Sequence, residues 1–112
     1  MRPEVNKFLA DALDSALESE RYSQGKTLAD LDSGSMLRSA IYHPFVIIGE
    51  ALTQMRRIDE ATFERISEVH RIAGFRNQII HGYQVIRNNV TWQIIQDKLP
   101  LLRRELEPLL AE

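Results

Sequence analysis

The spacing of apolar residues near the N-terminus predicts a long amphipathic helix. Apolar positions recur there every three or four residues, which lays one apolar stripe along about five helical turns. These positions are Val5, Phe8, Leu9, Ala12, Leu13, Ala16 and Leu17. Pro3 suits the first turn of such a helix, where a missing N–H costs nothing. The pattern therefore predicts a first helix over about residues 3–23.

The periodicity breaks between residues 24 and 36 and then returns. Gly25 interrupts it, and residues 30–35 have turn and N-cap chemistry, which predicts a loop with one short turn. Beyond the loop the spacing predicts a helix to about Arg57, with Leu37, Ala40, Ile41, Phe45, Ile48, Leu52 and Met55 as its apolar positions. Pro44 removes a hydrogen bond to the carbonyl four residues back, so we expect a kink there, or a helix that begins after it.

A short element and a third long helix follow. Asp59 can cap a short element that carries Phe63 and Ile66. The spacing over about residues 69–80 predicts the helix, and Gly82 is expected to end it because glycine readily adopts the left-handed conformation of a helix C-terminus.

The last helix has the clearest pattern of all. Asn88 or Asn89 is expected to cap it, and Pro100 lies within it. Its apolar positions alternate by three and four: Trp92, Ile95, Leu99, Leu102, Leu106 and Leu109. No segment alternates with period two between turn signals, so no strand is predicted. The predicted fold class is all-α, an up-down antiparallel bundle of four main helices in one domain, 1–112.

Composition narrows the classes of function. The chain has 112 residues, 44% of them apolar, no cysteine and a formal net charge of -2. The lack of cysteine removes thiol catalysis, iron–sulfur clusters and cysteine-built zinc sites, and the charge argues against a strongly cationic coat protein for nucleic acid. The N-terminus lacks the features of a signal peptide, and the longest apolar stretch, residues 45–48, is far below the roughly 20 residues that cross a bilayer. We expect a soluble cytoplasmic protein.

Charge is distributed unevenly along the chain. Residues 1–70 carry a net charge of -4, residues 71–104 carry +5 and residues 105–112 carry -3. A localised basic surface would suit a phosphate backbone. Cations toward a helix C-terminus also favour the helix dipole, so both interpretations stay open.

Three histidines are the first candidates for proton transfer, because the ordinary pKa of histidine lies near neutrality. Each follows an arginine by five positions, giving the pairs Arg38 and His43, Arg65 and His70, and Arg76 and His81. The first pair lies beside a proline and an apolar stripe, and the second lies among charged residues typical of a solvated helix face. Both of these pairs are interpreted as structural, and neither histidine receives a catalytic role.

The third pair has a distinctive setting. Asn77 follows the arginine, and Gly82 and Tyr83 follow the histidine, in the string Arg76-Asn77-Gln78-Ile79-Ile80-His81-Gly82-Tyr83. This string resembles the Arg-x4-His-x-Tyr signature of the HepT family, ribonuclease toxins within the larger class of HEPN domains (higher eukaryotes and prokaryotes nucleotide-binding).

The resemblance covers about residues 8–110. Three further segments resemble family segments and follow one another in the same order as in the family. They are Ile48-Gly49-Glu50-Ala51, Ile72-Ala73-Gly74-Phe75-Arg76-Asn77, and Trp92-Gln93-Ile94-Ile95 with Leu99-Pro100. Tyr42-His43-Pro44-Phe45 departs from the family pattern, which leaves the shape of the second long helix open.

The resemblance implies a HEPN-type bundle of four to five helices that forms a homodimer. It also implies a metal-independent endoribonuclease, without a cofactor, that acts as the toxin of a toxin–antitoxin pair. Arg76 and His81 match the catalytic pair, and Asn77 matches the polar, RNA-binding residue beside the arginine. The partner would be a nucleotidyltransferase antitoxin, which silences the toxin by transferring AMP from ATP onto Tyr83.

These residue types suit the chemistry. His81 can accept or donate the proton, and the planar guanidinium of Arg76 fits phosphate oxygens. Positions five apart on an ideal helix point about 140° apart, so either His81 lies past the helix end or one site draws residues from two subunits. Two other hypotheses stay open: a non-catalytic helical partner or substrate-binding subunit of a nucleotidyltransferase, and a bundle whose sole activity is association.

Overall fold

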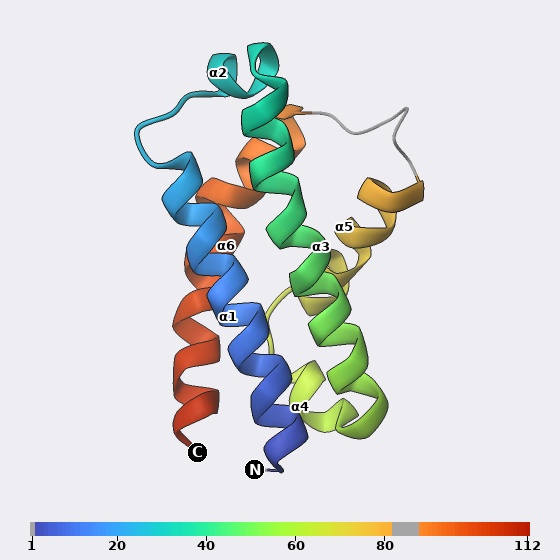
Figure 1. Cartoon of the computed structure of the whole chain (residues 1–112). Coiled ribbons are helices and arrows are strands. Elements are labelled where there is room, and N and C mark those ends of the chain that lie inside the picture. Colours follow the sequence, from blue (N-terminus) through green and yellow to red (C-terminus); the bar gives the residue numbers. More distant parts are fainter. Residues whose placement is uncertain (1, 82–87) are drawn as a thin grey trace.

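The structure, a computed structural model, describes residues 2–81 and 88–112. Within these ranges it contains six helices and no strand: α1 (Pro3–Ser23), α2 (Leu28–Ser33), α3 (Ser35–Ile58), α4 (Glu60–Glu64), α5 (Val69–His81) and α6 (Asn88–Ala111). The four long helices run up, down, up and down, so both chain ends lie at the same end of the bundle (Figure 1). The all-α prediction and the four main helices are confirmed.

The helix α1 has the predicted bounds, but its buried face differs from the predicted stripe. Val5, Leu9, Ala12 and Ala16 are buried as expected, whereas Leu17 is 43% exposed. Near its C-terminal end the buried positions are Ser15, Ser19 and Ser23 instead. The hydroxyl of Ser19 donates to the carbonyl oxygen of Ile41 at 3.3 Å, so a small polar residue fits the contact between α1 and α3.

The predicted loop after α1 contains a short helix, α2, stabilised by a capping box. The backbone N–H of Asp30 donates to the hydroxyl of Thr27, and the backbone N–H of Thr27 donates to the Asp30 carboxylate. These two bonds satisfy donors that a helix N-terminus otherwise leaves free.

The helix α3 runs without interruption through Pro44, so it does not begin after the proline. The ring of Pro44 is buried, and the proline lacks only the one N–H that would bond to the carbonyl of Ala40. The helix ends where Asp59 caps α4, as predicted: the backbone N–H of Thr62 donates to Asp59 at 3.1 Å and the Thr62 hydroxyl donates at 2.6 Å.

The start of α6 corrects one prediction. Asn88 is the first residue of the helix, so neither Asn88 nor Asn89 precedes it as a cap. Instead, Oδ1 of Asn88 accepts from the Tyr42 hydroxyl at 2.7 Å, and its Nδ2 donates to Asp32 at 2.9 Å. One asparagine therefore ties α6 to α2 and α3. Tyr42 belongs to the segment that departs from the family pattern.

The helix α3 lies at the centre of the packing, with α1 and α5 against it, while α6 packs on α1 (Figure 1). The buried core includes Leu52 and Met55 of α3, Leu99 and Leu102 of α6, and Phe45, whose ring meets Phe75 edge-to-face at 5.2 Å. No helix in the described ranges is long and apolar enough to cross a membrane.

Candidate active site

A glycine allows α5 to approach α3 at the position of Arg76. A Cβ atom added to Gly49 would lie 2.4 Å from the Cβ of Arg76 and 3.3 Å from the carbonyl oxygen of Ala73. Real atoms do not approach that closely, so any larger residue at position 49 would push the two helices apart. The close packing places the first half of the Arg-x4-His motif directly against α3.

The guanidinium of Arg76 is held by its two neighbours. Nη2 donates to Oε1 of Glu50 on α3 at 3.3 Å, and Nη1 donates to Oδ1 of Asn77 at 3.2 Å. Nε is buried without a hydrogen-bond partner, and the side chain as a whole is 30% exposed. The cation is therefore oriented by the fold and still accessible from one side.

Two shallow depressions flank the contact between α3 and α5. One, of about 230 Å³, is lined by Glu50, Thr53, Gln54, Arg57 and Arg76. The other, of about 250 Å³, is lined among others by Thr53, Arg56, His70, Gly74 and Asn77. Because Thr53 borders both, they form one polar surface along the two helices, which we call the α3–α5 seam.

The second half of the motif is described only in part. His81 is the last residue of α5, so the alternative in which it lies past the helix end is wrong. Tyr83 and Gly82 lie outside the described residues. The structure thus brings Arg76 and Asn77 together, and it places His81 on the same helix, five positions further on.

The other two histidines differ from each other. His43 is exposed on α3. His70 lies against the edge of the Phe63 ring, with ring centroids 5.2 Å apart, and its Nε2 is 2.8 Å from Oε1 of Glu64. The local ion pairs expected around His70 are confirmed, but the second depression adds that His70 shares a surface with Asn77.

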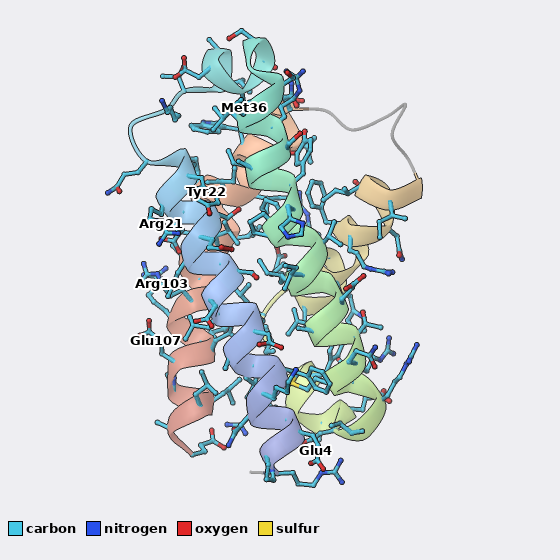
Figure 2. The ribbon with its side chains drawn as sticks, viewed as in Figure 1. Glu4, Arg21, Tyr22, Met36, Arg103 and Glu107 are labelled. Atoms are coloured by element: carbon cyan, nitrogen blue, oxygen red, sulfur yellow. The ribbon has the colours of Figure 1, made fainter. Side chains whose placement is uncertain are left out.

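Most described cations of the basic segment 71–104 are neutralised by carboxylates. Arg71 and Lys98 both pair with Glu68, and the hydrogen bond from Lys98 lowers the pKa of that carboxyl. Arg103, seen on α6 beside α1 (Figure 2), donates to Glu20 at 3.0 Å. With Arg76 paired to Glu50, the described part of the segment does not present its charge as one free basic surface.

The cations beside Arg76 come from a different part of the chain. Arg56 and Arg57 belong to the acidic first 70 residues, and the fold brings them to the α3–α5 seam. Counting charge along the sequence missed them, as it missed Glu50. A signal existed at Gly49, because a glycine inside a helix costs stability and calls for a packing reason.

In the parts of the chain that the structure describes, no group of three or more His, Asp or Glu side chains is placed to hold a metal ion.

Comparisons with known proteins agree with the motif. A family model described as ribonuclease HepT-like matches residues 12–109. "Putative RNase MJ1380" of Methanocaldococcus jannaschii is 29% identical over 106 residues, covering 93% of this chain and 94% of that protein. "Gamma-glutamylcyclotransferase and putative RNase MJ0434" of the same organism is 26% identical over 112 residues, covering 100% of this chain and 50% of that protein. No solved structure matches. The chain belongs to the ribonuclease HepT-like family.

Proposed function

We propose that this protein is a metal-independent endoribonuclease with its active site at the α3–α5 seam. The observation that carries the proposal is the guanidinium of Arg76, held at both Nη atoms and left partly exposed beside a polar depression. An oriented, permanently charged planar cation suits the charge that builds on a phosphate in the transition state. The names of two M. jannaschii relatives, both of which include RNase, support this assignment.

The reaction requires no group beyond protein and RNA. A base takes the proton of the 2′-hydroxyl, the 2′-oxygen bonds to the adjacent phosphorus, and the bond from phosphorus to the 5′-oxygen breaks. An acid returns a proton to the leaving 5′-oxygen, so the products carry a 2′,3′-cyclic phosphate and a 5′-hydroxyl. In this proposal His81 supplies one or both proton transfers, Arg76 stabilises the phosphate oxygens, and Asn77 orients Arg76.

We further propose that each active site combines two subunits. Arg76 and His81 lie on the same helix, where positions five apart point about 140° apart. A homodimer with two motif segments side by side would place Arg76 of one copy near His81 of the other. Mixing an Arg76→Ala protein with a His81→Ala protein should then restore up to about half of the parental rate per mixed dimer, because one of its two sites is intact. No recovery in dimers shown to have mixed would rule out the composite site.

We also propose that the protein is the toxin of a toxin–antitoxin pair. Its partner would be a nucleotidyltransferase antitoxin that transfers AMP onto Tyr83. A phosphate and a nucleoside placed two residues from His81 would repel or displace RNA. Tyr83→Phe should therefore remain toxic when the antitoxin is co-expressed, and full neutralisation of that variant would contradict this mechanism.

The test of the ribonuclease activity is direct. Purified protein should cleave single-stranded RNA in EDTA and leave 2′,3′-cyclic phosphate ends, while His81→Ala should be inactive. Absence of cleavage by the purified protein would favour the alternative, a non-catalytic partner of a nucleotidyltransferase.

A further inference from the structure

Two glycines, Gly49 and Gly74, lie inside helices where α3 packs on α5, and close packing explains only Gly49. A Cβ on Gly49 would clash with Arg76 at 2.4 Å. A Cβ on Gly74 would meet no atom within 4 Å outside its own helix turn. Glycine within a helix is destabilising relative to alanine, so the packing of the described residues does not account for Gly74.

The space that Gly74 leaves open is the second depression of the seam, of about 250 Å³. Its floor is the ring of Phe63, which is 1% exposed. The guanidinium of Arg56 lies over that ring, 5.2 Å from its centroid, with 46% of the Arg56 side chain exposed. A guanidinium fixed on an aromatic ring offers a flat surface on which a base can stack.

The polar groups around this space have unused hydrogen-bonding capacity on defined atoms. Oδ1 of Asn77 accepts from Arg76, which leaves the Nδ2 of Asn77 as a donor. In the neutral ring of His70, Nε2–H donates to Glu64, because a carboxylate only accepts, and Nδ1 is left as an acceptor. The depression therefore offers both a donor and an acceptor, the combination that the edge of a nucleobase requires.

We propose that the depression at Gly74 binds a nucleobase of the RNA, next to the phosphodiester bond that Arg76 engages. Arg56 stacks on the base, and His70 and Asn77 contact its edge. The inference rests on the proposed ribonuclease function, since Asn77 borders this depression and Arg76 borders the adjoining one. It makes His70, which borders the depression and contacts Phe63, the second histidine with a role in substrate binding, whereas His43 does not border the depression.

The experiment places a methyl group in the depression, where it meets no atom within 4 Å outside its own helix turn. Binding of fluorescein-labelled oligo(rA), oligo(rC) and oligo(rU) is measured in the His81→Ala background, so that no RNA is cut. Adding Gly74→Ala should leave the thermal midpoint Tm unchanged or higher, and it should weaken binding of at least one oligomer about tenfold. His70→Ala should also weaken binding, whereas the matched variant His43→Ala should not.

Salt dependence separates a base from a phosphate in the depression. Loss of a base contact leaves the slope of log K against log[salt] unchanged, whereas loss of one phosphate contact makes this negative slope shallower by about 0.7. The proposal is overturned by any of three results: Gly74→Ala binds every oligomer as the His81→Ala protein does, the slope becomes shallower by about 0.7, or the His81→Ala protein binds no RNA. If the wild-type protein binds but does not cleave RNA, the proposed function fails, while the Gly74→Ala result still decides whether the depression binds a base.

Discussion

The helix α3 packs against α1 on one side and α5 on the other, and the two contacts are built differently. Between α1 and α3 the buried residues are mainly apolar, with Leu9, Ala12, Ile48 and Leu52 all fully buried. At the α3–α5 seam a glycine brings the helices together, and a half-buried arginine bonds to a glutamate across the contact.

The contact between α1 and α3 mainly stabilises the fold, whereas the contact between α3 and α5 carries the candidate active site. Burial of apolar surface against α1 stabilises the bundle whatever the protein does. The Arg76 side chain, with a buried Nε that has no partner, contributes little to stability and keeps its charge at the surface. An unsatisfied polar atom of this kind is expected at a functional site.

The largest effect on stability should come from the α1 contact. Leu9→Ala removes a fully buried side chain and should lower the free energy of unfolding by about 2–5 kcal/mol. Urea denaturation measures this. The kcat of the folded fraction should stay close to the parental value, and a loss of kcat in fully folded Leu9→Ala would mean that the two contacts are not independent.

Gly49→Ala should lower both the stability of the fold and the catalytic efficiency. The added methyl group overlaps the Arg76 Cβ, so α5 must shift, at a cost of about 1–3 kcal/mol. The shift also moves Arg76 and should lower kcat/KM about 100-fold. Ser39→Ala, at an exposed position earlier on α3, is the control and should leave both the free energy of unfolding and kcat/KM unchanged.

Glu50→Gln should leave stability almost unaltered and change catalysis. The pair with Arg76 is partly exposed, and surface pairs contribute about 0–1 kcal/mol. The amide holds the guanidinium less firmly, so kcat should fall about tenfold. KM should not rise, because a negative charge near the RNA is lost. Glu4→Gln is the control, because it alters an exposed pair with Arg2 that lies far from Glu50 in the sequence. A parental kcat in Glu50→Gln would show that Glu50 does not position Arg76.

The smallest expected effect is a loss of stability in acid, where the hydrogen bonds from Arg65, directly after α4, to Glu112 are weakened. Hydrogen bonds from Arg65 hold the pKa of Glu112 below its ordinary value of 4.5. A lowered pKa in the folded state contributes stability above the unfolded pKa, and that stability is lost as pH falls through the folded value. Tm should therefore decline below about pH 4.5, and Arg65→Gln should flatten this decline, whereas Arg104→Gln, an exposed position on α6, should not. If Tm falls equally steeply with decreasing pH in the parent and in Arg65→Gln, the pair of Arg65 with Glu112 does not cause the decline.

The sequence predicted the elements better than the contacts between them. The bounds of α1 and the Asp59 cap follow from local spacing and capping chemistry, which depend on near neighbours only. The buried serines of α1 could not be predicted in this way, because they depend on how closely α3 crosses. The role of Asn88 likewise depends on Tyr42 and Asp32, which lie far away in the sequence.

In the candidate site, too, the local sequence motif was predicted and the contacts between helices were not. Arg76, Asn77, His81 and Tyr83 were found because they form a continuous motif. Glu50 and Arg57 join the site only through the packing of α3 on α5, and no spacing rule relates them to Arg76. Gly74 was visible in the sequence as a helix glycine, but its lack of a packing partner is a three-dimensional fact.

Arg76 is the group proposed to engage the phosphate, and one pair of cleavage rates tests this role. Arg76→Lys keeps the charge but loses the planar, paired donors. Arg71→Lys makes the same change on the same helix, at an exposed pair with Glu68. Under single-turnover conditions in EDTA, Arg76→Lys should cleave RNA about 100-fold more slowly than the parent, and Arg71→Lys should match the parent. Equal rates for the two variants would contradict an active site at the α3–α5 seam.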